Sequence, residues 1–227
     1  MHSAEDIKKL VGTYAAQFVE QDSVIGLGTG STVYWLLQEL GNRVKQGLRF
    51  TAVPTSSGTL AIGKELGINF TALNEVEELS VTIDGADEAD PELNLIKGGG
   101  GALLQEKMVA AASKKLIIIA DHTKIVEQLG KFPLPVEVIP FGWKHVQKSI
   151  AKLGCEKIVL RSRNNATYIT DSHNYILDCY FDTIKNAASL NAALHNIPGV
   201  VETGLFINMA STVIAGYADG KIVTIPQ

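Results

Sequence analysis

Short apolar runs that alternate with helix-forming segments constrain the fold of this chain more than any other feature. The runs lie at residues 23–27, 49–53, 79–83 and 115–120. The segments between and before them have helical character. Residues 3–20, for example, begin with a capping arrangement of Ser3 and Asp6 and then place apolar residues at helical spacing. The alternation predicts an α/β fold with a mostly parallel, Rossmann-like sheet covered by helices on both faces.

The order of the expected elements changes after about residue 132. We expect a strand at 136–139, a helix at 143–153, a strand at 157–160, a strand at 168–180 interrupted by a polar turn, a helix at 184–197 and a strand at 200–207. This β-α-β-β-α-β order is that of a small ferredoxin-like α+β unit. An Asp219-Gly220 turn then predicts a closing hairpin. The expected domains are therefore a Rossmann-like one of residues 1–130 and 208–227, and a ferredoxin-like one of residues 131–207 inserted before the hairpin.

Composition argues against several classes of protein. The chain has 227 residues, of which 46% are hydrophobic and 19% charged, as in a folded globular protein. Its net charge is −4, and no run of Lys or Arg predicts nucleic-acid binding. No apolar stretch approaches a membrane span, and Cys155 and Cys179 are too few for a disulfide-stapled secreted scaffold. We expect a cytoplasmic protein that binds neither nucleic acid nor membrane.

A glycine-rich loop, GLGTGST at residues 26–32, follows the first strand and precedes a helix. A helix N-terminus favours an anion, and Ser31 and Thr32 add hydroxyl donors. Ser31 stands where the dinucleotide fingerprint needs its third glycine, and the Gly-Lys-Ser/Thr ending of a triphosphate loop is missing. The loop therefore favours a single phosphate. The alternative is a tight strand-to-helix turn without a ligand.

Acidic residues gather in DGADE, residues 84–88, at the end of the third strand. Asp84, Asp87 and Glu88 are expected to point several carboxylates into the cleft beyond the carboxyl ends of the strands. Crowding there can separate their pKa values and supply both an acid and a base. The alternatives are a solvated acidic loop or a Mg²⁺ site, and the absence of a triphosphate motif disfavours the metal.

Four glycines follow a lysine in KGGGG, residues 97–101, and open a helix. Their N–H groups beside Lys97 suit a developing enediolate oxygen. Glu106, about one and a half turns into that helix, is either a base aimed at the ligand or a solvated surface residue. Lys124, in DHTK at the end of the fourth strand, adds a cation, although an ordinary loop also explains that tetrapeptide. The five histidines lack metal-ligand spacing.

Taken together with PTS at 54–56 and KFPLPVEV at 131–138, these motifs make the chain similar to the ribose-5-phosphate isomerases of the A type. The match runs in order through most of the chain and continues in PGVVETGLF from Pro198. The resemblance implies interconversion of D-ribose 5-phosphate and D-ribulose 5-phosphate in the pentose phosphate pathway, without metal or organic cofactor. It also implies a homodimer or a homotetramer, with the ferredoxin-like unit near a subunit interface.

The resemblance also gives each matched residue a role. Glu106 corresponds to the base that moves the C2 proton to C1, and Asp84, Asp87 and Lys97 surround the ring oxygen, O1 and O2 of the sugar. Asp84 is expected to assist ring opening, and Lys97 with the glycine N–H groups to hold the enediolate. The phosphate end is formed by Lys8, Ser31, Thr32 and Lys124, and the backbone loops around the substrate contain Thr29, Gly30, Gly85, Ala86, Gly98, Gly99 and Gly100.

Two positions depart from the family pattern, because Gly101 stands where many members have Ala and His122 with Thr123 fills a variable part of DHTK. Neither removes a group that the chemistry requires. Two functions other than isomerisation, sugar-phosphate sensing and hydride transfer, fit the sequence less well. A non-catalytic sugar-phosphate sensor would not need Glu106 and Lys97, and a nicotinamide-dependent oxidoreductase is disfavoured by Ser31.

Overall fold

The computed structural model describes residues 2–226, which group by their contacts into two compact units. The first, here called the Rossmann-like unit, contains the residues up to Ala86, residues 105–125 and the residues from Met209 onward. The second, the ferredoxin-like unit, contains residues 87–104 and 126–208. The units place residues 87–104, 126–130 and 208 differently from the predicted domain ranges. The domain ranges expected from the sequence, 1–130 with 208–227 and 131–207, therefore stay a prediction.

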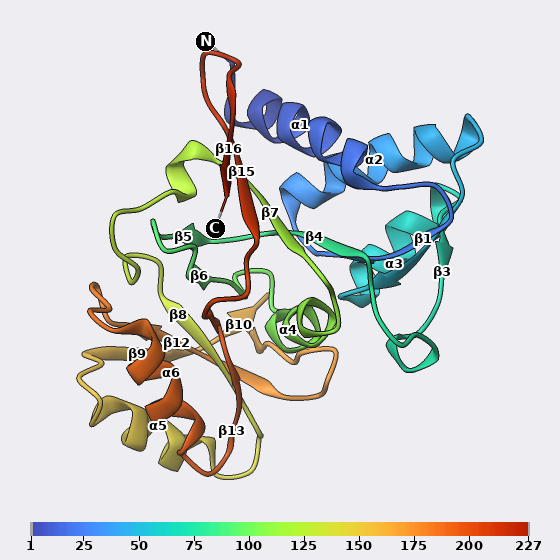
Figure 1. The fold of residues 1–227 in the computed structure, drawn as a ribbon. Helices are drawn as coiled ribbons and strands as arrows, with labels where there is room; N and C mark the ends of the chain where they lie inside the picture. The colour runs from blue at the N-terminus through green and yellow to red at the C-terminus, as the bar shows by residue number, and fades with distance from the viewer. Residues whose placement is uncertain (1, 227) are drawn as a thin grey trace. The chain divides into compact units, whose positions relative to one another are not determined.

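A seven-stranded sheet forms the centre of the Rossmann-like unit (Figure 1). Its strands, in chain order, are β1 (Ser23–Leu27), β2 (Phe50–Pro54), β3 (Asn69–Phe70), β4 (Val81–Gly85), β7 (Leu116–Asp121), β15 (Thr212–Gly216) and β16 (Ile222–Pro226). They are arranged as β16-β15-β7-β4-β1-β2-β3, and every pairing is parallel except that of β15 with β16. The predicted parallel sheet and closing hairpin are therefore confirmed.

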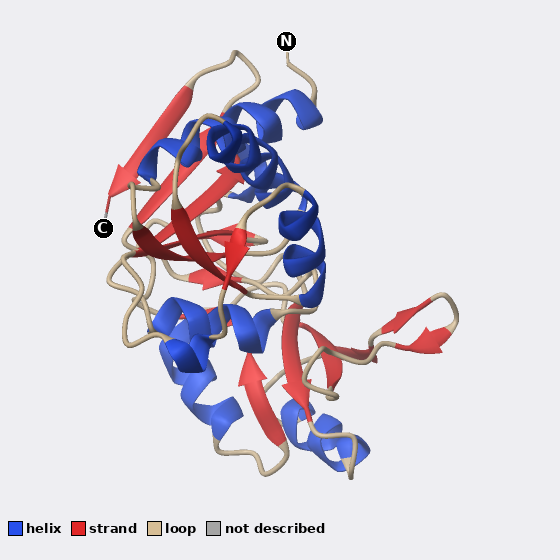
Figure 2. Cartoon of the chain, turned by 90° about the vertical axis from the view of Figure 1, so that its right-hand side faces the viewer, coloured by secondary structure: helices blue, strands red, loops and turns tan. Residues whose placement is uncertain are grey.

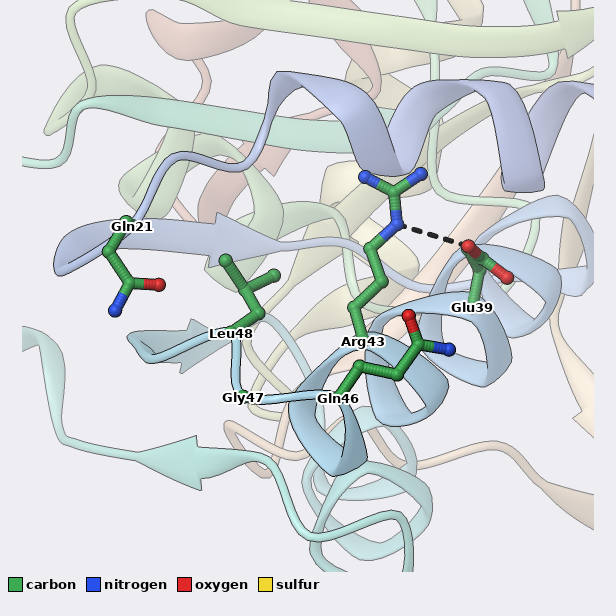
Figure 3. Close-up of a pocket in the computed structure, with 6 residues that line it drawn as sticks. All are labelled: Gln21, Glu39, Arg43, Gln46, Gly47 and Leu48. Atoms are coloured by element: carbon green, nitrogen blue, oxygen red, sulfur yellow. Dashed lines mark hydrogen bonds and ion pairs between the residues drawn. The ribbon is translucent and has the colours of Figure 1, made fainter.

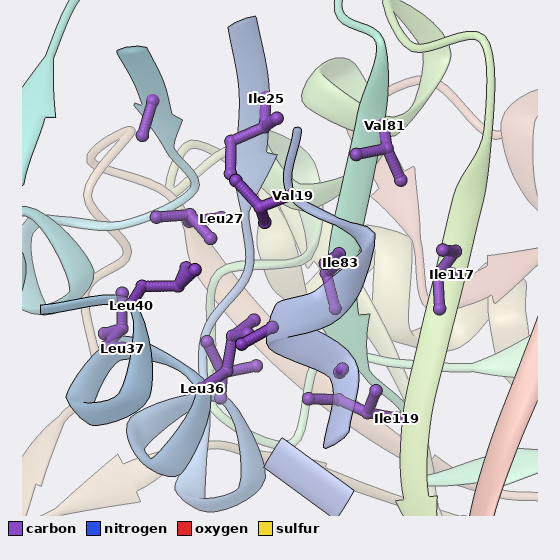
Figure 4. Close-up of a cluster of buried hydrophobic side chains, with 14 of the residues drawn as sticks. Val19, Ile25, Leu27, Leu36, Leu37, Leu40, Val81, Ile83, Ile117 and Ile119 are labelled. Atoms are coloured by element: carbon purple, nitrogen blue, oxygen red, sulfur yellow. The ribbon is translucent and has the colours of Figure 1, made fainter. Parts of the chain in front are cut away.

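Helices cover both faces of this sheet. They are α1 (Ala4–Ala15), α2 (Ser31–Lys45), α3 (Ser57–Glu65) and α4 (Leu103–Ala111), with short 3₁₀ turns η1 (Ala16–Phe18), η2 (Leu73–Glu75) and η3 (His122–Lys124). The alternation of side chains along β1 explains the two faces: Ile25 and Leu27 pack with α1 and α2 (Figure 4), whereas Val24 packs with Val109 of α4. No helix among residues 2–226 is long and apolar enough to cross a membrane.

The first helix begins as its sequence predicts. Ser3 Oγ accepts the N–H of Asp6 at 3.2 Å, and the N–H of Ser3 donates to Asp6 Oδ2 at 3.0 Å. This reciprocal pair of bonds satisfies two N–H groups that the start of a helix leaves without partners. The apolar face that follows, which includes Ile7 and Val11, is buried against the sheet.

The ferredoxin-like unit contains the predicted β-α-β-β-α-β series (Figure 2). It consists of β8 (Leu134–Val138), α5 (Trp143–Ala151), β9 (Lys157–Leu160), β12 (Tyr175–Tyr180), α6 (Ala187–His195) and β13 (Val200–Thr203). Its sheet has the order β13-β8-β12-β9, with every pairing antiparallel. This unit also has an exposed hairpin of β10 (Ser162–Arg163) and β11 (Ala166–Thr167), which was not predicted. Of the strand predicted at 168–180, only β12 forms, because residues 168–170 are not part of a strand.

The strand predicted at 200–207 is in fact two strands of different sheets. It breaks at Gly204, after which β14 (Leu205–Phe206) pairs with β6 (Leu95–Ile96), and β6 pairs with β5 (Glu88–Ala89). Gly204 donates its N–H to Pro135 O at 2.7 Å, and its own carbonyl accepts the N–H of Lys97 at 2.8 Å. A Cβ atom on Gly204 would collide with the carbonyl oxygen of Lys97. Only glycine allows this close approach of two backbones.

Candidate active site

The strand order of the Rossmann-like sheet reverses between β1 and β4. In open parallel sheets, ligands bind beyond the carboxyl ends of the strands at such a switch point. Residues 28–32 follow β1, Asp84 and Gly85 end β4, and Lys124 follows the neighbouring strand β7. The sheet therefore brings three motifs, far apart in the sequence, together at the carboxyl ends of its strands.

The loop after β1 leads directly into α2. Gly30 is the residue before the helix and has a φ of 128°, a value that L side chains rarely adopt. No side chain among the described residues caps α2 at Gly30. The first N–H groups of the helix, at Ser31 and Thr32, are therefore positioned to bind an anion, and the helix dipole adds to the attraction.

Thr29 is held by hydroxyl groups that follow β2. Its Oγ1 donates to Ser56 Oγ at 2.8 Å and lies 2.9 Å from Thr55 Oγ1. Thr59 Oγ1, in α3, donates to Gly28 O at 2.7 Å. The side chain of Thr29 thus fixes the shape of the loop, while its backbone faces Asp84. The PTS motif at 54–56 contributes through this network.

Lys8 lies on α1, one turn before the point where α1 crosses the start of α2. At that crossing, a Cβ atom on Gly12 would lie 2.8 Å from Thr32 O, so the two backbones almost touch. Lys8 Nζ is 3.7 Å from Glu5 Oε2, and its side chain is 25% exposed. On β7, Asp121 accepts the N–H of Thr123 at 3.0 Å and begins the turn that contains Lys124.

Asp84 is 1% exposed and is oriented by the loop after β1. Its Oδ1 accepts the N–H of Thr29 at 3.0 Å and the N–H of Gly85 at 2.7 Å. Two backbone donors fix the plane of a carboxylate much more firmly than solvent would. Asp84 is therefore a preorganised group at the end of β4.

Glu106 is 4% exposed, which rules out the solvated surface position that the sequence left open. The helix begins at Leu103 rather than at the glycines, so Glu106 lies in its first turn and not about one and a half turns into it. Three residues later, Val109 packs on the face of β1 that is opposite to α1 and α2. It lies so close to the strand that a Cβ atom on Gly26 would overlap Cγ1 of Val109. Glu106 thus lies one turn nearer the start of α4 than this anchor.

In the ferredoxin-like unit, the remaining predicted residues surround the glycine loop, here defined as residues 98–101. Lys97 is 2% exposed, and its Nζ lies 5.4 Å from the centre of the Phe206 ring. Asp87 Oδ2 accepts the N–H of Gly99 at 2.7 Å. Gly98 and Gly101 have φ angles of 103° and 92°. The N–H of Gly99 is therefore engaged by Asp87, which was not expected of a loop whose N–H groups were predicted to suit an enediolate oxygen.

Glu88, the third acid of DGADE, was expected to point a carboxylate into the cleft, but its two oxygens are engaged by backbone N–H groups. It is 3% exposed, and its two oxygens accept the N–H groups of Gly130 and Phe132 at 2.7 and 2.6 Å. These bonds give it a structural role. No group of three or more His, Cys, Asp or Glu residues within 2–226 is arranged to hold a metal ion.

Two largely buried groups near the glycine loop, Arg161 and Glu137, were missed by sequence reasoning. Arg161 donates to the carbonyl of Gly98 at 2.7 Å. Glu137, on β8, accepts from Thr170 Oγ1 at 2.9 Å and Asn174 Nδ2 at 3.0 Å, and burial raises its pKa. For Glu137 the signal was a lone acid inside the apolar run PVEV, whereas Arg161 had none, because a single Arg after a strand is ordinary.

A pocket near the amino ends of β1 and β2 in the Rossmann-like sheet contains none of the predicted residues (Figure 3). It has a volume of about 490 Å³ and is lined by Gln21, Glu39, Arg43, Gln46, Gly47 and Leu48. These residues precede β1 and β2, and Arg43 Nε bonds to Glu39 Oε1 at 3.0 Å. The amino ends of parallel strands are not where this fold binds its ligands.

Comparison with known proteins agrees with this geometry. A sequence model described as ribose 5-phosphate isomerase A (phosphoriboisomerase A) matches residues 51–220. The ribose-5-phosphate isomerase A of Bacillus cereus is 60% identical over 95% of this chain and 98% of its own length. The solved ribose 5-phosphate isomerase from Plasmodium falciparum has a TM-score of 0.94 at 37% identity, with 98% of this chain and 99% of that one covered. A D-ribose-5-phosphate isomerase in complex with phospho-erythronic acid has a TM-score of 0.96 at 37% identity over 100% of both chains. This chain belongs to the ribose 5-phosphate isomerase A family.

Proposed function

We propose that this chain interconverts D-ribose 5-phosphate and D-ribulose 5-phosphate through an enediolate, in the non-oxidative pentose phosphate pathway. The observation that carries the proposal is the burial of three ionisable side chains at the matched positions: Asp84, Lys97 and Glu106 are at most 4% exposed. Such residues are rarely buried, because removing a charge from water costs free energy. Three such residues at positions that the family resemblance assigns to the reaction, in a chain 60% identical to a ribose-5-phosphate isomerase A, support a chemical role.

The proposed reaction starts with opening of the furanose ring, in which Asp84 exchanges a proton with the anomeric hydroxyl. Glu106 then removes the proton from C2, and the electron pair moves into the C1–C2 bond as O1 becomes negative. Lys97 and glycine N–H groups stabilise that oxygen. Glu106 returns the proton to C1, and a proton passes from O2 to O1 with the help of Asp87. One carboxylate serves both carbons because they are adjacent.

The phosphate is proposed to bind at the start of α2. The N–H groups and hydroxyls of Ser31 and Thr32 would donate hydrogen bonds to its oxygens, and Lys8 and Lys124 would supply positive charge. Gly30, with its φ of 128°, allows the backbone to turn there. Neither metal nor organic cofactor is part of this proposal.

The direct test is an assay of ketose formation from ribose 5-phosphate by the purified chain, with no cofactor added. We expect ribulose 5-phosphate to accumulate to equilibrium. Binding of ribose 5-phosphate without turnover would instead indicate a sensor. Binding of NAD(H), with hydride transfer, would indicate an oxidoreductase.

We also propose a cytoplasmic homodimer or homotetramer. Cys155 and Cys179 are free thiols in the structure, which suits a reducing compartment. The ferredoxin-like unit exposes Phe141 to 89%, a large apolar side chain of the kind that subunit interfaces cover. Light scattering of the purified protein measures the number of subunits, and a monomer would contradict this proposal.

A further inference from the structure

One peptide group of the glycine loop is held at both of its polar ends. The N–H of Gly99 donates to Asp87 Oδ2 at 2.7 Å. The carbonyl oxygen of Gly98, in the same peptide, accepts Arg161 Nη1 at 2.7 Å and the N–H of Gly101 at 3.0 Å. A glycine peptide rotates easily when it is unrestrained, because no Cβ limits its backbone angles. These three bonds therefore select one of its two orientations.

The direction of Arg161 is itself fixed by Asp178 on β12. Arg161 Nε donates to Asp178 Oδ2 at 3.0 Å, and Nη2 contacts Oδ1. The two side chains are only 13% and 16% exposed. A planar guanidinium held by a two-point contact has its remaining N–H groups aimed in one direction. Here that direction is the glycine loop, since Nη1 also lies 3.3 Å from Gly99 O.

Two N–H groups of the glycine loop have no partner among the described residues. These are the N–H groups of Gly98 and Gly100, which make no hydrogen bond within residues 2–226. The carbonyl of Gly100 accepts from Tyr168 Oη at 3.4 Å, so the carbonyls of Gly98, Gly99 and Gly100 are all engaged by the side chains of Arg161 and Tyr168. The loop thus separates its acceptors, which bind protein, from two donors that remain available for a ligand.

We propose that Arg161, oriented by Asp178, is a positioning residue that holds the carbonyl oxygens of Gly98 and Gly99 away from the substrate, so that the N–H groups of Gly98 and Gly100 face the enediolate oxygen. The inference rests on the proposed isomerase function. If the Gly99–Gly100 peptide turned over, the carbonyl oxygen of Gly99 would replace the N–H of Gly100 beside the developing negative charge and repel it. Arg161 would act through the loop without touching the substrate.

The test compares kcat and KM for ribose 5-phosphate in variants of the pair. Arg161→Gln is expected to lower kcat by about 100-fold, as loss of an oxyanion donor does, with KM changed less than about threefold because the phosphate contacts remain. Arg161→Lys should recover part of this loss by donating to one carbonyl. Asp178→Asn should lose much less, because Arg161 keeps its bonds to the loop. The matched control is Arg49→Gln, which breaks an exposed ion pair of the same kind with Asp22, 3.1 Å from Nε to Oδ1.

Hydrogen–deuterium exchange at the N–H of Gly101, which bonds to Gly98 O, gives a readout that does not require activity. It should become faster in Arg161→Gln and stay unchanged in Arg49→Gln. If wild-type protein did not isomerise ribose 5-phosphate, the function would be wrong while this exchange still tested the loop. Should Arg161→Gln not fold because Asp178 loses its partner, the double variant Arg161→Gln, Asp178→Asn is expected to show the same losses. Unchanged exchange at the N–H of Gly101, or a kcat within twofold of wild type, in Arg161→Gln would overturn the proposal.

Discussion

The carboxylate of Asp84 lies directly over the Cα of Gly28, in the space that a side chain at position 28 would occupy. A Cβ atom on Gly28 would overlap both Oδ1 and Cγ of Asp84. The close approach also lets the next N–H in the loop, that of Thr29, donate to Oδ1 at 3.0 Å. Gly28 is therefore needed for the position of an acid rather than for an unusual backbone angle of its own.

Replacing Gly28 with Ala is expected to displace Asp84. A misplacement of about 1 Å at a reacting group can cost about 100-fold in rate, so we expect a kcat loss of that order. Overpacking should also lower the free energy of unfolding by about 1 to 3 kcal/mol. Kinetics and urea unfolding measure the two effects.

Gly58→Ala is the matched control, since the nearest atom to a Cβ there is Ser56 Oγ at 3.8 Å. In helix α3 this change should leave kcat unaltered and stabilise the fold by about 0.5 to 1 kcal/mol. Equal kcat values for the two variants would show that the position of Asp84 does not matter.

Removing either lysine of the proposed phosphate site should weaken substrate binding. Each charge-assisted contact is worth about 1.5 to 3 kcal/mol, so Lys8→Ala and Lys124→Ala should raise KM by roughly 10- to 100-fold. Lys9→Ala is the control on the same helix, because Lys9 Nζ lies over the ring of Trp35 at 5.2 Å instead. Ribose without its phosphate should be a poor substrate for every variant. Equal turnover of ribose and ribose 5-phosphate would refute the phosphate site.

Isomerisation should continue after chelation. The proposed site stabilises charge with Lys97 and backbone N–H groups instead of a divalent ion. We expect the same kcat before and after dialysis against EDTA. Loss of activity that Mg²⁺ or Zn²⁺ restores would show that the acids of DGADE bind a metal.

Patterns with local causes predicted most of the fold. The alternation of strands and helices, the capping box at Ser3 and the β-α-β-β-α-β order each depend on neighbouring residues, and the structure confirms them. The break at Gly204 could not be predicted in this way, because its cause is the backbone of Lys97, more than 100 residues earlier in the chain.

The same distinction between local patterns and distant contacts applies to the candidate site. Glycine loops and strand-end acids are visible as motifs, so the predicted residues could be named from sequence. Which of them are buried, and which N–H groups are already engaged, depends on distant partners. Asp87 binds Gly99, and Glu88 binds Gly130 and Phe132, so two neighbouring acids of one motif have different partners. No sequence pattern distinguishes them.

Stability should depend on pH through Glu137. Burial raises the pKa of Glu137 above the ordinary 4.5, and the charge of Glu202 raises it further. Hydrogen bonds from Asn174, Thr170 and the N–H of Leu104 favour the charged form and partly oppose this rise. Between the unfolded and the folded pKa, the folded chain binds more protons than the unfolded one. Glu137 therefore makes its full contribution to the free energy of unfolding below about pH 4.5, and this contribution is lost as pH rises through the pKa of Glu137 in the folded chain.

Urea unfolding of the wild type and Glu137→Gln, from pH 4 to pH 8, measures this contribution. We expect the stability of the wild type relative to Glu137→Gln to decrease as pH rises above about 4.5, and then to become constant. A relative stability that increases over this range would mean that the pKa of Glu137 is lowered by folding.

The role of Glu106 is the central claim. Replacing it with Gln keeps the size and hydrogen bonding of the side chain and removes only its ability to take a proton from carbon. A general base contributes about 10² to 10⁴-fold, so kcat should fall by at least that order while the affinity for a non-reacting substrate analogue changes little. Glu88 is a poor control because it holds two backbone N–H groups. Glu78→Gln is better, since Glu78 is exposed and pairs only at the surface, with Lys114 at 2.9 Å.

The most direct measurement is the exchange of the C2 proton of ribose 5-phosphate with deuterium from solvent, followed by NMR in the presence of each variant. Wild type and Glu78→Gln should exchange this proton as they isomerise the sugar, and Glu106→Gln should exchange it at least about 100-fold more slowly. Exchange by Glu106→Gln at the wild-type rate would contradict the account, and the base would then have to be Asp84 or Asp87.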